Sequence, residues 1–226
     1  MNTITLGSLM IRADILIFFI SAAAGFFALK WRLRRREESA WILDLYVNAL
    51  LIGFLVWKFS MIVFDPVRTF RYPMSLLYFT GGDKGVLLGT ALALIYIGFR
   101  VNGKKERTGT LIRAAALAFV AGGFMKHAFT LLWSGSFDWP EALNVALYAI
   151  FTVWLWLTYN DSFRSLLSQA LWFSIASVMT PFFKEDRHAV FAGFTSAQIA
   201  FSVISIILLL VETAWMKKND SFHEHL

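Results

Sequence analysis

"AFVAGGFMKHAFTLLW", residues 118–133, is apolar enough to lie inside a membrane, yet it carries Lys126 and His127 side by side near its middle. About 20 apolar residues in a helix cross a bilayer, and this stretch continues an apolar block that begins at Leu111. Ionisable residues at membrane depth are costly and often functional. The stretch therefore predicts a transmembrane helix that carries functional polar groups.

The composition of the whole chain predicts a membrane protein. Of its 226 residues, 58% are hydrophobic and 16% are charged, whereas soluble domains average about 45–50% and 25%. The apolar residues fall into seven blocks, so we predict an all-α polytopic protein with a single integral membrane domain over residues 1–226. The predicted spans are residues 9–29, 41–64, 85–99, 111–133, 142–159, 165–183 and 194–215.

The basic residues predict the orientation of these spans. The formal net charge is +6, and basic clusters occupy the short connections at residues 30–36 and 100–107. Short cytoplasmic loops carry an excess of lysine and arginine. We therefore predict that the N-terminus lies outside and the C-terminus inside. Because the charge is explained by topology, we expect no nucleic-acid partner.

Two lysines mark the outer half of the predicted bundle. Lys58 lies six residues before the outer end of the second span and Lys126 seven before Trp133, about 9 and 10 Å deep in a helix. One interpretation is a cavity open to the outer leaflet, in which the lysines and His127 bind a phosphate head group. The alternative is that both lysines snorkel to the interface and that His127 is a hydrogen-bonded core residue.

Several classes of site are not indicated by the sequence. The chain has no cysteine, no G-x-S-x-G turn, no H-E-x-x-H pair and no G-x-x-x-x-G-K-[ST] loop. We therefore expect no metal and no cofactor. The longest outer segment, "DPVRTFRYPMSLLYFTGGDKG", is apolar for a loop, which predicts that it lies along the interface or re-enters the protein at membrane depth.

The order of the motifs resembles the prolipoprotein diacylglyceryl transferase family. The opening "ITLGSLMIRADILIFFI" is similar to the family's I-x-I/L-G-P-L-x-I-x-W segment, and "FTGGDKGVLLG" is similar to its H-G-G-L-x-G motif. "DWPEAL" stands at the family's H-P-S-Q-L, and "FFKEDRHAVFAGFTSAQ" resembles E-F-x-R-x-D followed by G-L-T-x-x-Q. The resemblance implies a seven-span bacterial plasma-membrane protein. Members transfer diacylglycerol from phosphatidylglycerol to the lipobox cysteine of a prolipoprotein.

The chain departs from the family at its functional positions. The signature G-R-x-G-N-F-x-N-x-E falls on "GGFMKHAFTL", where Gly123 replaces the essential arginine and Lys126 the asparagine. Lys58 stands where the second span of the family has an arginine. The other substituted positions are Lys84 or Asp83 for the H-G-G histidine, Asn144 for a tyrosine, Ser177 for the second arginine, Pro181 for a glutamate, Met125 for a glycine and Leu131 for the signature glutamate.

Two classes of function follow from these observations. The favoured one is a transfer-inactive relative that binds an anionic phospholipid, by resemblance phosphatidylglycerol, or a lipoprotein or other envelope partner. The alternative is an active transferase of lipoprotein modification with a variant site, with His127, Lys126 and Lys84 as its catalytic candidates. The predicted head-group residues are Lys58, Lys84, Lys126 and His127.

Overall fold

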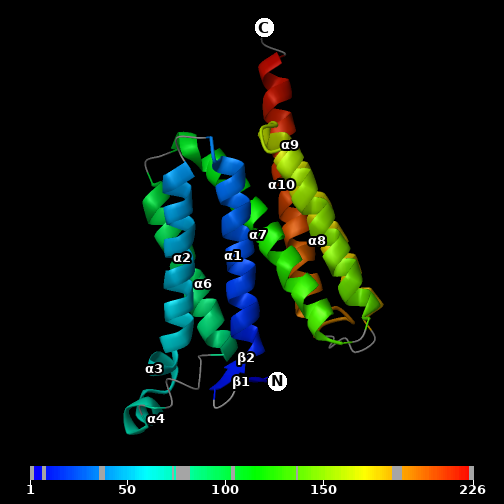
Figure 1. Ribbon diagram of the computed structural model, residues 1–226. Helices are drawn as coiled ribbons and strands as arrows, with labels where there is room; N and C mark the ends of the chain where they lie inside the picture. Colours follow the sequence, from blue (N-terminus) through cyan, green and yellow to red (C-terminus); the bar gives the residue numbers. More distant parts are fainter. Residues whose placement is uncertain are drawn as a thin grey trace. The chain divides into compact units, whose positions relative to one another are not determined.

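The computed structural model describes residues 3–6, 9–35, 39–72, 74, 82–102, 105–135, 137–184 and 190–223. Among these described residues, seven helices are long and apolar enough to cross a membrane. The prediction of an all-α, multi-pass membrane protein is therefore confirmed (Figure 1). The predicted orientation stays a prediction.

The chain divides into two compact units. Residues 1–28 and 115–226 form the first unit, and residues 29–114 form the second. Each unit is described separately below, and the single membrane domain stays a prediction. The helices are α1 (Ala13–Leu33), α2 (Ser39–Phe59), α3 (Met61–Phe64), α4 (Pro66–Arg71), α6 (Gly82–Val101), α7 (Lys105–Trp133), α8 (Trp139–Leu157), α9 (Phe163–Met179), the 3-10 helix η1 (Thr180–Phe183) and α10 (Ser196–His223).

The predicted start of the first span at Leu9 is wrong. Strands β1 (Thr3–Leu6) and β2 (Leu9–Arg12) pair as a short antiparallel hairpin, and α1 begins only at Ala13. The β-branched residues of "TITL" favour a strand, and pairing with it holds "LMIR" in an extended conformation. The apolar run of the first span therefore starts later than hydrophobicity alone indicates.

Other span boundaries also differ from the prediction. The third span has 20 residues in α6 and is long enough to cross a bilayer. The fifth begins at Trp139, because Pro140 in the first turn is compatible with a helix start. The sixth ends in η1, where Pro181 follows Thr180. Of the long outer segment, α4 covers the first part, while residues 73 and 75–81 lie outside the described residues.

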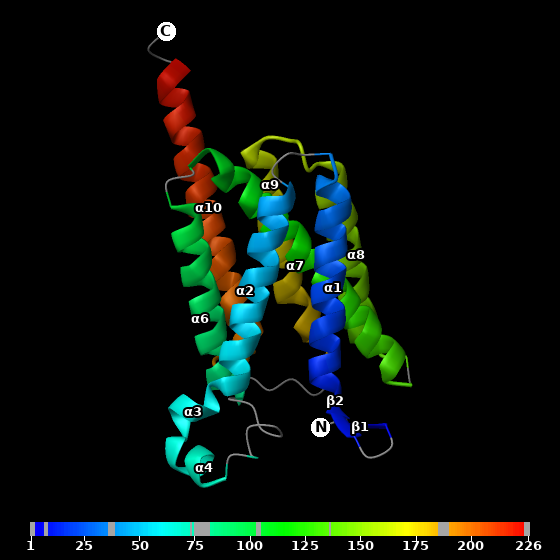
Figure 2. The ribbon, with the colours of Figure 1, turned by 60° about the vertical axis from the view of Figure 1, so that its left-hand side comes forward.

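In the second unit, α2 and α6 lie side by side (Figure 2). Glycines make this close approach possible: a Cβ atom added at Gly89 would lie 2.5 Å from the carbonyl oxygen of Gly53. At Gly85 it would lie 3.2 Å from the carbonyl oxygen of Trp57. Small residues that bring backbones together are the usual basis of helix association in membranes.

In the first unit, an aromatic cluster packs α7 to α10 together. The Phe173 ring of α9 lies edge-on to Phe119, Tyr148, Phe151 and Phe201, with centroid distances of 5.2–6.1 Å. Such edge-to-face pairs stabilise beyond the area that they bury. The cluster therefore fixes the facing sides of the four helices that form the site described below.

Polar pairs add to this packing in the first unit. Ser174 of α9 and Ser205 of α10 are hydrogen-bonded at 2.8 Å. The side chain of Gln198, fully buried in α10, donates to the Val178 carbonyl oxygen at 3.1 Å. Hydrogen bonds between helices replace those that water would make in a soluble protein.

Candidate functional site

The site is built around a hydrogen-bonded pair of ionisable residues on neighbouring helices. His127 of α7 and Glu141 of α8 meet with 2.7 Å between Nδ1 and Oε1. Their side chains are only 15% and 9% exposed. Because an ionised carboxylate can only accept a hydrogen bond, Nδ1 carries the hydrogen of this bond. Nε2, the other ring nitrogen, makes no hydrogen bond to any described residue.

A lysine from a third element approaches the same carboxylate. Lys184 follows η1, and its Nζ lies 3.6 Å from Oε2 of Glu141. At 45% exposed, the lysine side chain is much more accessible than its partner. The separation exceeds that of a good charge-assisted hydrogen bond, about 2.7–2.9 Å. The ammonium group can therefore turn toward another anion while staying near Glu141.

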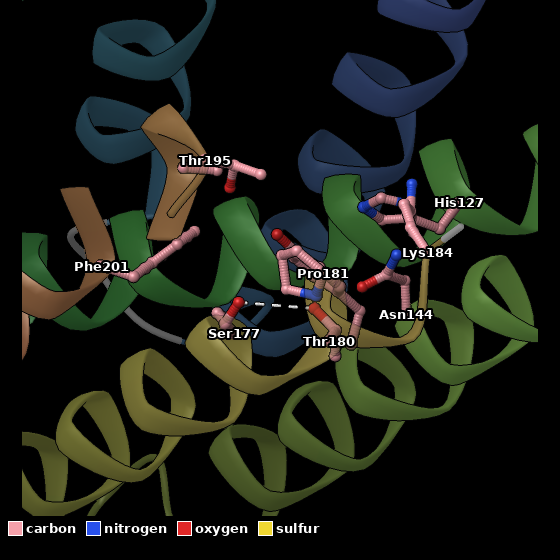
Figure 3. Close-up of a pocket in the computed structure, with 10 residues that line it drawn as sticks. His127, Asn144, Ser177, Thr180, Pro181, Lys184, Thr195 and Phe201 are labelled. Atoms are coloured by element: carbon pink, nitrogen blue, oxygen red, sulfur yellow. Dashed lines mark hydrogen bonds between the residues drawn. The ribbon is translucent and has the colours of Figure 1, made fainter. Parts of the chain in front are cut away.

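A cavity of about 400 Å³ lies beside this group, within the first unit (Figure 3). It is formed by α7, α8, α9, η1 and the start of α10. Seven of its ten lining residues carry a hydroxyl, amide or ionisable group, although their apolar atoms form much of its wall. The lining residues are His127, Asn144, Tyr148, Ser177, Thr180, Pro181, Lys184, Thr195, Ala197 and Phe201.

One lining hydroxyl has an unmet hydrogen bond. Ser177 is 6% exposed, and its Oγ has no partner among the described residues. Its carbonyl oxygen, by contrast, accepts a hydrogen bond from Thr180 Oγ1 at 3.4 Å (Figure 3). A buried hydroxyl without a partner is costly. Ser177 Oγ is therefore an unmet hydrogen-bonding group of a residue in the cavity wall.

The start of α10 places Thr195 at the cavity by a reciprocal cap. Its backbone N–H donates to Gln198 Oε1 at 2.9 Å, and the Gln198 N–H donates to Thr195 Oγ1 at 3.3 Å. This is the capping box that the sequence "TSAQ" encodes. The preceding turn uses Gly193 at a φ of 80°, a conformation that glycine adopts easily.

The ring of His127 is held in place by Tyr148. The two ring centroids are 4.9 Å apart, with an interplanar angle of 34°. Gly123, one helical turn before His127, faces the same tyrosine. A Cβ atom added at Gly123 would overlap the Tyr148 ring, with Cζ at 3.0 Å. Any side chain at position 123 would therefore displace the ring that supports His127.

The predicted head-group residues do not all line this cavity. His127 does, whereas Lys126 is exposed on α7 and is not among the lining residues. Adjacent helical residues point about 100° apart, so the two cannot share one orientation. Lys58 is half-buried in α2 and Lys84 is exposed in α6, both in the second unit. Head-group binding by these three lysines stays a prediction.

Sequence reasoning missed the functional grouping of Glu141, Asn144 and Lys184. Glu141 and Asn144 are buried at positions i and i+3 on one face of α8. A signal was present: two polar residues one turn apart at the start of an apolar span, opposite a span with a buried histidine. Lys184 could not be placed, because its position depends on η1.

The arrangement can bind and orient a small polar group. Its described lining residues include one exposed cation, several hydrogen-bonding side chains and an imidazole whose Nε2 has no described partner. No protein-family model, curated protein or solved structure matches the chain.

Proposed function

We propose that this membrane protein binds the head group of an anionic phospholipid in the cavity beside His127, Glu141 and Lys184. The observation that carries the proposal is the cavity itself. It lies among membrane-spanning helices, its lining is rich in hydrogen-bonding groups, and Lys184 is its exposed cation. His127 lies six residues before the end of α7, about 9 Å along the helix. Because α7 has 29 residues, this position in a spanning helix is close to the boundary between the head-group layer and the hydrocarbon core.

The chemistry of the lining favours a head group that contains both a phosphate and hydroxyl groups. Lys184 is the donor for the phosphate. The uncharged side chains of Asn144, Ser177, Thr180 and Thr195 suit hydroxyl groups, which both donate and accept hydrogen bonds. Glu141 opposes a second anion close to its carboxylate, so the phosphate is expected on the side of Lys184 Nζ that faces away from Glu141.

From the resemblance noted in the sequence, we propose that this lipid is phosphatidylglycerol and that the membrane is the bacterial plasma membrane. Asn144, Ser177 and Pro181 stand at positions where the transferase family has functional residues, and all three line the cavity. This convergence supports a divergent relative of that family. Gly123 supports loss of transfer, because an arginine there would displace Tyr148. A lipoprotein or other envelope partner also stays a prediction.

Lipids that co-purify with the protein test the binding proposal. Lys184→Met removes the ammonium group and keeps an unbranched side chain. Because one charge-assisted hydrogen bond is lost, native mass spectrometry should show roughly tenfold less bound phosphatidylglycerol. Arg71→Met is the control, since Arg71 is an exposed basic residue of α4 and does not line the cavity. Equal retention in the wild type and in Lys184→Met would reject the proposal.

A second candidate function is favoured by the free Nε2 of His127. A carboxylate that fixes the opposite nitrogen is the usual arrangement of a histidine base. In the transfer that the resemblance implies, Nε2 would take the proton of a lipobox cysteine thiol. The sulfur would attack the diacylglycerol carbon, the carbon–oxygen bond to phosphate would break, and glycerol phosphate would leave. Release of glycerol phosphate that is lost in His127→Ala would favour this enzyme over the binding module.

A further inference from the structure

A second cavity of about 220 Å³ lies in the same unit and has an almost purely apolar lining. It is surrounded by α7, α8, α9 and α10. Phe201, which lines the polar cavity (Figure 3), also lines this one. The other main lining residues are Ala116, Phe119, Phe151, Leu155, Leu166, Ala170, Phe173, Ile204 and Leu208.

On each of the helices α7 to α10, one end of the helix lines the polar cavity and the part further along it lines the apolar cavity. On α8, Asn144 and Tyr148 line the polar cavity, whereas Phe151 and Leu155 line the apolar one. On α9, the polar end is at Ser177 and the apolar end is at Leu166, about 16 Å away along the helix. Together the cavities therefore present a polar-to-apolar gradient along the helices.

Each of the two polar residues of the apolar cavity makes a hydrogen bond to a neighbouring side chain. Gln169 Nε2 donates to Thr158 Oγ1 at 2.5 Å, and Ser174 is paired with Ser205. Because the described lining is almost purely apolar, the cavity offers little with which to hold water. Its volume exceeds the roughly 150 Å³ of an engineered apolar cavity that stays dry and binds benzene. At membrane depth, the available filler for such a space is hydrocarbon.

We infer that the apolar cavity holds one acyl chain of the lipid whose head group occupies the polar cavity, with Phe201 at the junction. The inference rests on the proposed head-group site. It adds that the protein takes the lipid into the α7–α10 unit, chain included. Recognition then depends on chain shape as well as on head-group charge.

Photo-crosslinking distinguishes this inference from surface binding. The probe is phosphatidylglycerol with a photoactivatable group in one acyl chain, added to the purified protein in phosphatidylcholine nanodiscs. The expected sites of attachment, mapped by peptide mass spectrometry, are cavity residues such as Leu166, Phe173 and Leu208. Attachment only at exposed positions such as Trp172 or Leu209 would overturn the inference, without need of any variant.

A cavity-filling variant gives a second test. Ala170→Phe, which adds a ring to the apolar cavity, should lower cavity labelling at least fivefold and leave the preference for phosphatidylglycerol over phosphatidylcholine. Ala146→Phe, on the exposed face of α8, should change neither. Unchanged labelling in a folded Ala170→Phe protein would overturn the inference. The proposed function itself fails if the wild type shows no preference for phosphatidylglycerol over phosphatidylcholine and if Lys184→Met is labelled as strongly as the wild type.

Discussion

Removing the carboxylate of Glu141 should destabilise the first unit through its bond to His127. The Nδ1–Oε1 distance is 2.7 Å and both side chains are largely buried. A hydrogen bond to a charged group contributes about 1.5–3 kcal/mol, whereas neutral interhelical bonds in membranes average only about 0.6 kcal/mol. The half-exposed Lys184 contributes about 1 kcal/mol or less. We therefore expect Glu141→Ala to lower the free energy of unfolding by about 1.5–4 kcal/mol.

A double-mutant cycle isolates the pair from other effects of each substitution. His127→Ala, Glu141→Ala and the double variant are compared by reversible unfolding in mixed micelles, and the expected coupling energy is about 1–3 kcal/mol. Glu141→Gln keeps an acceptor for the Nδ1–H of His127, so it should lower the free energy of unfolding less than Glu141→Ala does. The control is Asp138→Ala. Its carboxylate is exposed and makes no cap hydrogen bond to α8, so it should stay within about 0.5 kcal/mol of the wild type. A coupling energy below about 0.5 kcal/mol would refute the reasoning.

Three further predictions concern packing, interhelical bonding and topology. Gly89→Ala should destabilise the protein by about 1–3 kcal/mol, because its Cβ atom would overpack against Gly53. Gly98→Ala, on the same helix but with nothing within 4 Å of its added Cβ, should be neutral or stabilising by up to about 1 kcal/mol. Equal thermal stability of the two variants would contradict the close approach of α2 and α6. Gln198→Leu should cost about 1–2 kcal/mol, because the Val178 carbonyl oxygen loses its donor from α10; an unchanged unfolding curve would show that this bond does not join α9 to α10. The native chain has no cysteine, so a single introduced cysteine can be labelled without interference. From the predicted orientation, a cysteine at Ser134 should react with an impermeant external reagent and a cysteine at Asn102 should not. The reverse pattern would show that the orientation is inverted.

The number and approximate positions of the spans could be predicted because they depend on local composition. Twenty apolar residues between basic connections produce a helix wherever they occur. The failure at Leu9–Arg12 has a different source. Those residues are apolar, but pairing with Thr3–Leu6 overrides the pattern. Span ends likewise depended on single residues, as at Pro140 and Pro181.

The candidate site was predictable only at its centre. His127 stood out because an ionisable ring in an apolar span needs a partner. Its neighbour Lys126 stood out equally, yet the helix turns the two side chains apart and leaves Lys126 exposed. Glu141 and Lys184 join the site through the packing of α8 and η1. Such contacts between distant segments leave no periodic trace in one sequence.

The surroundings of Ser177 also could not be predicted from the sequence. The resemblance singled Ser177 out as the position of an arginine, but only the structure gives its Oγ a buried position without a described partner at the cavity. The distinction between structural and binding serines in α9 depends on neighbours: Ser174 has Ser205 across the helix interface, and Ser177 Oγ has no such partner in the described part of the chain.

A crystal structure grown from a lipid mesophase doped with phosphatidylglycerol would test the central claim most directly. Phosphate density is expected within about 2.7–2.9 Å of Lys184 Nζ. The hydroxyl groups of the head group are expected to lie toward Asn144 and Ser177. A cavity filled only by water, with lipid density confined to the outer surfaces of the helices, would contradict the claim.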